Sequence, residues 1–561
     1  MSTAAQTVSS LKKAINDAVA KAISEGSLSS AEMPDFTVEI PADRSHGDLA
    51  TNAAMVSAKV FRLAPRKIAE IITQNICLDG TKLSRFEIAG PGFINFFFDR
   101  SYYASVLEEI KTQGENYGRS DFGQGKKILV EFVSANPTGP MHVGNARGGA
   151  IGDSLASVLD AAGYEVAREF YVNDAGNQIE KFATSLEVRY LQLYKEGVEL
   201  PEDAYKGQDI IDHAKNFAEI NGNKYVDTSS EERRKALVDY ALPLNIAGLE
   251  RDLLKYRIRY DRWFRESTLH NSGAVKKIVE LLKEKGHTYE LEGATWFKAT
   301  EFGADKDFVL VRSNGIPTYV VPDIAYHYDK LVTRGYDKAI DVLGADHHGY
   351  VPRLKAALTA LGVDASRLDV VLMQMVRLMS NGEVIKISKR SGKAITLVTL
   401  LDEIPIDAAR FFFNLREANS HFEFDLDLAI EQSSQNPVYY VQYAHARICN
   451  ILKNLREDGI EARNCTDTDY ELLTAAEEIE LINKLAAYSD EIIAAAKDYD
   501  PSRITRYLYD TATLFHKFYN ACRVKNDNES LMQARLALCL ATRTVIANVL
   551  HMFKIEAPES M

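Results

Sequence analysis

The chain has 561 residues, of which 46% are hydrophobic, and its formal net charge is −13. This length predicts several domains with sizeable cores, and the acidic balance excludes a generally basic coat for nucleic acid while allowing a local basic surface. The five cysteines form no C-x-x-C pair, so neither a zinc knot nor a disulfide framework is indicated. Because the chain has neither an apolar run of about 18 residues nor a signal-peptide pattern, we expect a cytoplasmic protein with no membrane association.

The first segment, residues 1–115, is predicted to be a separate α+β domain. Apolar residues recur at helical spacing over residues 11–23, and residues 93–98 form an aromatic-rich run that is typical of a strand. The stretch 114–125 is rich in glycine and polar residues, which predicts a linker to the next domain.

Residues 120–425 alternate predicted strands and helices, which is the pattern of a parallel sheet. The apolar run 128–133 predicts a buried strand that contains one carboxylate, Glu131. Asn136 and the residues around it break the strand, and a helix is expected to begin near His142. A strand, a turn and a glycine-bearing helix start together indicate a nucleotide site, because the first N–H groups of a helix bind phosphate.

The stretch 175–290 is charged and mostly helical, with no strand pattern before residue 289. It therefore predicts an insertion between two halves of the sheet. Further strands are expected at residues 307–311, 340–343 and 370–373.

A hairpin is predicted at Asn381 and Gly382, a pair that suits a type I′ turn. It leads into residues 386–393, where four cations occur within eight residues. From these residues alone two interpretations stay open: a solvated surface loop, or a clamp whose lysines bind a polyphosphate. His142 has the same two alternatives, an ordinary loop histidine or a donor to phosphate.

Residues 426–561 show a helical pattern with no strand alternation. Basic and aromatic residues interleave there, as single-stranded bases require for phosphate contacts and stacking. Alternatively, the aromatic side chains form the core of a bundle and the charges form a solvated face. The candidate RNA-contacting residues are Arg503, Arg506, Tyr507, His516, Tyr519 and Arg523.

Two of these segments together are far more specific than either alone. The His-x-Gly-x start at 142–145 and the Lys-x-Ser-Lys loop at 386–389 resemble the paired ATP signatures of class I aminoacyl-tRNA synthetases, with Asn145 in place of the final His of the first signature. Over nearly its whole length the chain resembles arginyl-tRNA synthetases. The matching segments are 131–145, 171–178, 323–327, 344–350, 386–390 and 436–447.

The resemblance implies an α/β fold: a Rossmann-type parallel-sheet catalytic domain with a helical insertion, an N-terminal α+β domain that touches the outer corner of the tRNA, and an all-α anticodon-binding domain over 426–561. It implies ATP-dependent ligation of L-arginine to its cognate tRNA(Arg) through an arginyl-adenylate, with the tRNA bound before arginine is activated. ATP and Mg²⁺ would enter as substrate, with no structural metal, and a monomer is expected.

The resemblance also assigns the site residues. Catalytic roles go to His142, Asn145, Lys386 and Lys389. The ATP-binding set is His142, Gly144, Asn145, Lys386, Ser388 and Lys389. The arginine-binding set is Tyr319 and Asp323 for the side chain, Glu131 and Asn136 for the amino-acid part, and His347 as a further acceptor. The helical residues named above would contact tRNA.

The chemistry of the residues agrees with this assignment. A guanidinium presents five donors, so a selective pocket needs carboxylates and carbonyl-type acceptors. Glu131 in an apolar strand is costly unless it is paired, and a cationic substrate would explain it. For Asp323 the alternative role is to cap the helix that follows, and both roles can coexist.

Two rival functions stay open. One is a class I synthetase for another amino acid, such as cysteine, although such enzymes hold zinc through Cys and His and the cysteines here are scattered. The other is a non-catalytic tRNA-binding relative, against which the presence of His142, Lys386 and Lys389 argues.

Overall fold

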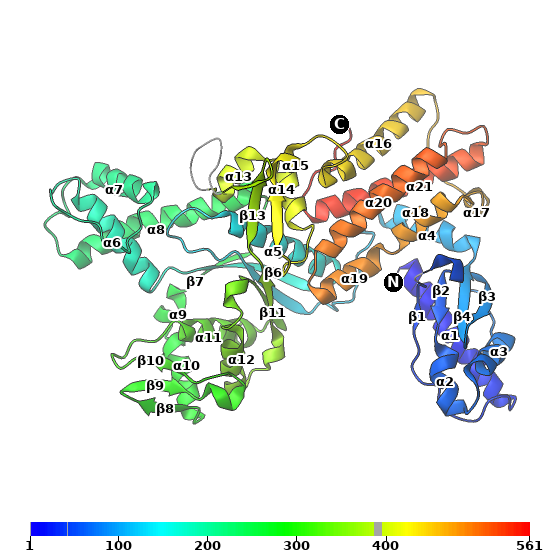
Figure 1. Cartoon of the computed structure of the whole chain (residues 1–561), viewed down its shortest axis with the longest axis horizontal. Helices are drawn as coiled ribbons and strands as arrows, with labels where there is room; N and C mark the ends of the chain where they lie inside the picture. The colour runs from blue at the N-terminus through cyan, green and yellow to red at the C-terminus, as the bar shows by residue number, and fades with distance from the viewer. Residues whose placement is uncertain (1, 42, 386–394) are drawn as a thin grey trace.

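A computed structural model describes residues 2–41, 43–385 and 395–561 of the chain. Figure 1 shows a parallel sheet near the middle of the molecule, with the insertion helices and a small β-sheet at one end. The long C-terminal helices and the N-terminal domain lie at the other end. None of the described helices is long and apolar enough to cross a membrane.

The N-terminal domain is an antiparallel sheet, in the strand order β1-β2-β4-β3, packed against helices. Its core contains Leu11, Ile15 and Phe96. The helix α4, by contrast, buries its apolar face in the core cluster shared with the C-terminal helices. The elements are α1 (Thr3–Ser24), β1 (Val38–Glu39), η1 (Arg44–His46), β2 (Leu49–Thr51), α2 (Ala53–Phe61), α3 (Pro65–Asn75), β3 (Leu83–Ala89), β4 (Phe93–Phe98), α4 (Arg100–Gln113) and η2 (Gly114–Asn116).

The central sheet is parallel throughout, in the order β12-β11-β5-β6-β7 among the described strands. This confirms the predicted Rossmann-type fold. The chain leaves β5 toward β6 on one side and returns to β11 on the other, so the crevice between the carboxyl ends of β5 and β11 is the topological switch point. The elements are β5 (Lys127–Phe132), α5 (Val143–Ala161), β6 (Glu165–Val172), β7 (Arg262–Arg265), β11 (Lys338–Gly344) and β12 (Leu368–Met373).

The two faces of this sheet are covered by different helices. Val130, Phe132 and Phe170 belong to the core cluster of α5, whereas Tyr171 belongs to the cluster of the helices on the opposite face. Because side chains alternate along a strand, Glu131 points to the same face as Tyr171. Helix α5 packs very closely, since a Cβ at Gly152 would lie 2.3 Å from the Phe132 ring.

The predicted insertion needs two corrections. Strand β7 lies inside 175–290, yet it pairs with β6 in the main sheet; its four residues, two of them terminal arginines, are too few to show a pattern. Strand β10, expected in the main sheet at 307–311, pairs instead with β9 in a separate antiparallel sheet. The elements are α6 (Asn177–Leu191), α7 (Gln208–Asn221), α8 (Ser230–Lys255), α9 (Ser267–Asn271), α10 (Ala274–Glu284), β8 (Thr288–Leu291), β9 (Ala294–Phe297), η3 (Ala299–Phe302) and β10 (Phe308–Val311).

Between β10 and the C-terminal helices the chain completes the catalytic part. The predicted hairpin is confirmed: β13 pairs with β14, and Asn381 and Gly382 have φ of 52° and 74°, as a type I′ turn requires. The elements are α11 (Val320–Tyr328), η4 (Asp329–Thr333), η5 (Ala345–His347), α12 (Val351–Ala360), η6 (Ala365–Arg367), β13 (Val376–Ser380), β14 (Glu383–Ile385), α13 (Leu397–Glu403), α14 (Ile406–Phe413), β15 (Phe422–Asp425) and α15 (Leu426–Ile430).

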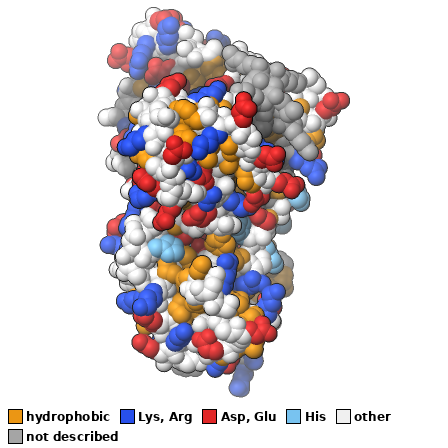
Figure 2. Space-filling model, turned by 90° about the vertical axis from the view of Figure 1, so that its left-hand side faces the viewer, with side chains coloured by type: hydrophobic (Ala, Val, Ile, Leu, Met, Phe, Trp, Pro, Cys, Tyr) orange, Lys and Arg blue, Asp and Glu red, His pale blue; other side chains and the backbone are white. Residues whose placement is uncertain are grey.

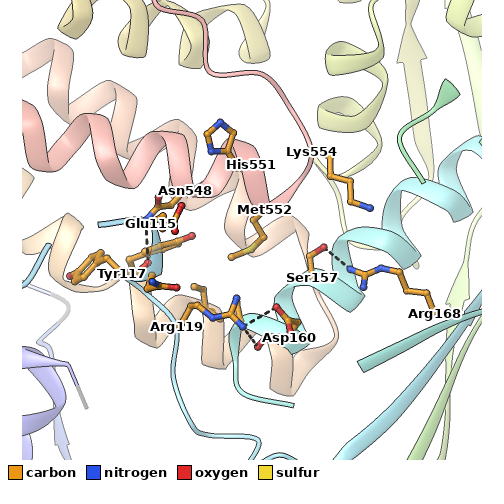
Figure 3. A pocket seen from close by; sticks show the side chains of 14 residues that line it. Glu115, Tyr117, Arg119, Ser157, Asp160, Arg168, Asn548, His551, Met552 and Lys554 are labelled. Carbon is orange, nitrogen blue, oxygen red and sulfur yellow. Dashed lines mark hydrogen bonds and ion pairs between the residues drawn. The ribbon is translucent and has the colours of Figure 1, made fainter. Parts of the chain in front are cut away.

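The C-terminal part is helical, as predicted, and its buried residues share one core cluster with α5. Asp153 of α5 is fully buried and binds Arg410, Lys554 and Arg168. Figure 3 shows the cavity beside this junction, which measures about 520 Å³. The elements are α16 (Pro437–Glu457), α17 (Asp467–Tyr470), α18 (Ala476–Ala486), α19 (Tyr488–Asp498), α20 (Ser502–Ala521) and α21 (Glu529–Met552).

At the end of the molecule that carries the insertion helices, the described residues form no surface of a single charge. Figure 2 shows that acidic and basic side chains are interspersed over this face. Any attraction for an anionic partner there would come from local groups of cations, in keeping with the net charge of −13.

Candidate functional site

The candidate site lies at the switch point, where polar residues follow the strands. Glu131 is at the end of β5, Glu266 follows β7, and His347 follows β11. Parallel strands end at one edge of the sheet, so these residues gather there even though they are far apart in the sequence.

The turn from β5 into α5 carries the first of the two predicted ATP signatures. His142 occupies the N-cap of α5 and is exposed, and its backbone N–H donates to the Asn145 side-chain oxygen at 3.0 Å. Asn145 therefore uses its oxygen within its own helix, which leaves the amide NH₂ as its donor. A Cβ at Gly144 would meet nothing within 4 Å. Protein packing does not require this glycine, so it leaves room for a ligand above the helix start.

Glu131 has a partner within the protein. Its carboxylate accepts hydrogen bonds from the Lys330 ammonium and from the Ser134 hydroxyl. Lys330 is completely buried and also donates to Asp341 at 2.9 Å. The expectation that a cationic substrate explains the buried acid is therefore wrong: a lysine 199 positions later supplies the cation.

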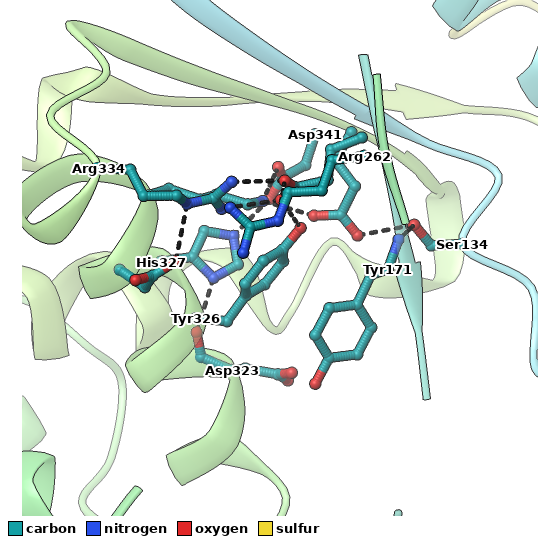
Figure 4. A network of polar contacts seen from close by, with 12 residues as sticks. Ser134, Tyr171, Arg262, Asp323, Tyr326, His327, Arg334 and Asp341 are labelled. Carbon is teal, nitrogen blue, oxygen red and sulfur yellow. Dashed lines mark hydrogen bonds and ion pairs between the residues drawn. The ribbon is translucent and has the colours of Figure 1, made fainter. Parts of the chain in front are cut away.

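A row of carboxylates crosses three neighbouring strands at this point. Glu131 is in register with Glu169 on β6 and with Asp341 on β11. Lys330 lies against Glu131 and Asp341, and Arg334 forms two hydrogen bonds with Glu169. Figure 4 shows this network from close by. The charges of the row are thus opposed by Lys330 of the π-helical turn η4 and by Arg334, the residue that directly follows that turn.

This balance is visible in the ionisation of the groups. Burial alone would lower the pKa of Lys330, but Asp341 and Glu131 outweigh that effect and raise it. Burial would raise the pKa of Asp341, but Lys330 and His327 hold it well below its usual range.

Glu131, His327 and Asp341 offer ligand atoms close enough together for a metal ion. The ammonium of Lys330 already binds two of these residues, so the group does not fit as a metal site.

Asp323, unlike Glu131 and Asp341, has no lysine or arginine partner among the described residues. It lies in the first turn of α11, and the N-cap of that helix is Tyr319, so the alternative role of Asp323 as the N-cap is wrong. Its carboxylate accepts a hydrogen bond from the Tyr350 hydroxyl, a neutral partner, and no residue that the structure describes forms an ion pair with it. Burial raises the pKa of Asp323 to about 6, although the Tyr350 hydrogen bond opposes this. A half-buried carboxylate of this kind is suited to receive a cation.

The other predicted arginine ligands, Tyr319, Asn136 and His347, are exposed. Tyr319 is 54% exposed, beside the first residue of α11. Asn136 is exposed in the turn after β5, and His347 is exposed in η5 with its ring 3.9 Å from the Asp346 carboxylate. The structure brings none of these three into a hydrogen bond with Asp323.

Two residues of the site were not found from the sequence. Glu266 is buried and accepts a hydrogen bond at 2.9 Å from the Tyr171 hydroxyl. The charge of Glu266 contributes to the raised pKa of Asp323, after burial. Tyr350 donates to Asp323. Glu266 was missed because β7 was missed, whereas Tyr350 ends the matching segment 344–350 and could have been considered as a ligand of the same pocket.

A large cavity lies beside the ATP signature. It measures about 1210 Å³ and is lined by His142, Val143, Gln374–Leu378, the β14 side of the hairpin, and His421. The exposed Met375, at 83%, contributes an apolar wall. Lys386, Ser388 and Lys389 of the second signature lie outside the described residues, directly after β14.

The C-terminal candidates separate into two groups. Tyr507 is 2% exposed, and its hydroxyl donates to the Lys484 carbonyl, so the prediction that it contacts RNA is wrong: it is a core residue. Arg503 and Arg506 form ion pairs with Glu491 and Asp500. Arg523 is exposed just after α20.

His516 and Tyr519, in contrast, belong to an aromatic cluster formed between α16 and α20. The His516 ring is 4.9 Å from Tyr440 and stacks on Tyr443 at 6.0 Å. The Arg447 guanidinium lies 4.3 Å from the centre of the Tyr519 ring. Burial and the nearby Arg447 lower the pKa of His516 to about 4, so its ring is neutral at physiological pH. Tyr443 remains 39% exposed.

Comparison with known families covers almost the whole chain. The family described as class I (R) tRNA synthetase catalytic domain matches residues 106–453. The arginyl tRNA synthetase N-terminal domain matches residues 9–98, and the DALR anticodon binding domain matches residues 441–561.

Individual relatives agree. The chain is 57% identical to the arginine–tRNA ligase of Caldanaerobacter subterraneus over 99% of both chains, and 47% identical to that of Shouchella clausii over 98% of this chain and 99% of the other. The solved arginyl-tRNA synthetase of Thermus thermophilus is 22% identical, has a TM-score of 0.75, and covers 99% of this chain and 100% of its own. At that identity the last likeness shows the fold alone.

Proposed function

Because this chain belongs to the arginyl-tRNA synthetase family and its activity is arginine–tRNA ligation, we propose how its residues divide that reaction among them. The arginine guanidinium binds Asp323, with Tyr319 closing the mouth of the pocket. The observation that supports this is the contrast between two acids of the site, Glu131 on β5 and Asp323 on α11. Glu131 has its own lysine, while Asp323 is half-buried with a raised pKa and a neutral partner.

The amino-acid part of arginine lies toward Glu131 and Asn136, at the carboxyl end of β5. Glu131 binds its ammonium only as an additional partner, because its oxygens already accept from Ser134 and Lys330. A carboxylate has about four lone-pair sites, so further acceptance is possible. His347 remains an acceptor at the rim of the pocket.

ATP occupies the cavity beside His142, with its phosphates at the start of α5. His142 and the Asn145 amide donate to phosphate oxygens, and Gly144 lets the nucleotide approach the backbone. Lys386, Ser388 and Lys389 stabilise the leaving pyrophosphate. Mg²⁺ enters with the nucleotide phosphates, in keeping with the occupation of the acidic cluster by Lys330.

The chemistry needs no covalent enzyme intermediate. The arginine carboxylate attacks the α-phosphorus in line, which forms arginyl-adenylate and releases pyrophosphate. A hydroxyl of the tRNA 3′-terminal ribose then takes the arginyl group and releases AMP. The protein contributes positioning and charge stabilisation.

tRNA(Arg) contacts the C-terminal helices through the aromatic cluster of Tyr440, Tyr443, Arg447, His516 and Tyr519. Tyrosine faces and an arginine plane between α16 and α20 suit unstacked bases. Arg503, Arg506 and Arg523 supply phosphate contacts. We further propose that residues 1–115 touch the outer corner of the tRNA, that 120–425 is the catalytic unit, that 426–561 binds the anticodon, and that the enzyme acts as a monomer.

ATP–pyrophosphate exchange with arginine, run with and without tRNA(Arg), tests the reaction order. Exchange that requires tRNA is expected. For the pocket, Asp323→Ala should raise the KM for arginine far more than the KM for ATP, and the substitution Asp305→Asn at an exposed aspartate serves as the matched control. Equal loss of both substrates in Asp323→Ala would refute the pocket assignment.

A further inference from the structure

The backbone just after β5 is in an unfavourable conformation. Val133 has φ of 69° and Ser134 has φ of 41°, and neither is glycine. The Ser134 N–H donates to the Phe132 carbonyl at 3.0 Å, so the turn spans three residues with positive φ at its centre. Such a turn is rare and strained, and a β-branched residue such as Val133 is among the least suited to it. Conformations of this kind persist only where the surroundings hold them.

A buried hydrogen-bonded chain holds this turn. The Ser134 hydroxyl donates to Glu131 at 2.8 Å and accepts from the Tyr171 backbone N–H at 3.1 Å. Glu131 in turn accepts from Lys330, which is completely buried. The turn is thus tied to the neighbouring strand β6 by one bond and to the π-helical turn η4 by the other.

Lys330 is itself fixed from several directions. Its ammonium donates to Asp341 and lies 4.1 Å from the centre of the Tyr326 ring. Asp341 also binds the His327 ring at 2.6 Å, and the other nitrogen of that ring lies 2.7 Å from the Asp323 carbonyl. Figure 4 shows these groups converging between η4 and the sheet. A π-helical turn within a helical segment is often found at a functional site.

The strained turn connects two parts of the proposed site. In the sequence it is preceded by Glu131 on β5 and followed by Asn136 and by the start of α5 at His142. A change of φ at Val133 or Ser134 would redirect every residue that follows until α5 begins. The same chain of groups reaches α11 at the Asp323 carbonyl. It therefore connects α5, the helix proposed to bind ATP, with α11, the helix that carries Asp323, the proposed ligand of the arginine guanidinium.

We propose that Ser134 and Lys330 are positioning residues for this reaction: through Glu131 they hold Val133 and Ser134 in the left-handed conformation and so place His142 and Asn136 relative to Asp323. The inference rests on the proposed function for the roles of those three residues. It assigns to Glu131 a structural role in addition to its proposed role in binding arginine. It also explains why Glu131 forms an ion pair with a lysine of the protein itself.

Ser134→Ala in the full-length enzyme tests the hydrogen bond without burying a charge. The substitution should lower kcat/KM for aminoacylation of tRNA(Arg) about tenfold or more, because the turn then populates relaxed conformations. A merely structural role would show the same loss, so rescue is the deciding measurement. Val133→Gly in the Ser134→Ala enzyme should restore most of the activity, since glycine adopts positive φ without cost.

Val133→Ala in the same background is the matched control. It removes the valine packing as glycine does, but it keeps a Cβ and therefore the conformational penalty. It should restore little. If the alanine variant rescues as well as the glycine variant, or if neither rescues, the turn is not what Ser134 holds and the proposal fails. Wild-type activity of Ser134→Ala would overturn it as well.

A readout independent of activity uses the otherwise unaltered chain. At ordinary negative φ, glycine is less stabilising than alanine, whereas at positive φ the order reverses. Val133→Gly should therefore have a higher Tm than Val133→Ala, and the opposite order would overturn the proposal. Failure of the arginine-pocket assignment is detected separately, by an unchanged arginine KM in the Asp323→Ala enzyme.

Discussion

The ionised Asp323 carboxylate should destabilise the ligand-free enzyme. We therefore expect the free energy of unfolding to rise when its charge is removed. Burial raises the pKa of Asp323 from 3.8 to about 6, and a tenfold change in an ionisation equilibrium corresponds to about 1.4 kcal/mol. Because the folded-state pKa is raised, the ionised form costs folding free energy. That cost is absent below about pH 3.8 and complete above about pH 6. Since the side chain is only half-buried, we discount the full value to about 2 kcal/mol.

Asp323→Asn removes this cost while keeping an oxygen that can accept from Tyr350. At pH 7.5 the variant should be more stable than the wild type by about 2 kcal/mol, and the gain should disappear near pH 4, where the wild-type carboxyl is protonated. Arginine affinity should fall about 30-fold or more, because a buried charge pair can no longer form.

Urea unfolding followed by tryptophan fluorescence measures the stability change. The two tryptophans, Trp263 and Trp296, lie on β7 and β9, so the signal reports on the catalytic part. Isothermal titration with arginine measures affinity, and Asp305→Asn, which changes an exposed aspartate away from the site, should change neither quantity. If Asp323→Asn is less stable than the wild type at pH 7.5, the carboxylate is not an unpaired buried charge, and the reasoning behind the pocket is refuted.

The remaining predictions concern residues of the same site and the anticodon helices. Lys330→Met should destabilise the enzyme by about 3–5 kcal/mol, because it leaves buried carboxylates unpaired, and adding Glu131→Gln should recover part of this loss in urea unfolding; no recovery would contradict the pairing. Tyr443→Ala should weaken binding of tRNA(Arg) by about 1–3 kcal/mol in a filter-binding assay, whereas Tyr507→Phe should leave it unchanged because that ring is core; equal effects would contradict the division. His142→Ala should raise the KM for ATP while leaving arginine affinity in titration intact, and a loss confined to arginine would contradict the phosphate role.

Several elements could be predicted because their signals are local. The Asn381-Gly382 pair specifies a type I′ turn whatever surrounds it, and the hairpin is present. The apolar run at 128–133 is a strand because buried parallel strands are continuously hydrophobic. Strand β7 escaped prediction because four residues with arginine at each end carry no such pattern, and its place is decided by pairing with β6.

The C-terminal helices show the same limit. Tyr507 and Tyr519 are both tyrosines on one basic, aromatic helix, and composition does not distinguish them. The helix turns Tyr507 into the bundle, where its hydroxyl meets the Lys484 carbonyl, and turns Tyr519 toward Arg447. Which aromatic residues can meet a base follows from the orientation of α20 in the bundle.

Glu131 shows most clearly what each level decides. An acid in an apolar strand requires a cationic partner, and the sequence alone determines that requirement. Either a substrate or an internal lysine would satisfy it equally well. Only the tertiary structure decides, because it brings the π-helical turn η4 against the sheet and places the Lys330 ammonium on the carboxylate. Asp323 receives only the neutral Tyr350 hydroxyl among the described residues, which is why we propose it as the ligand of the guanidinium.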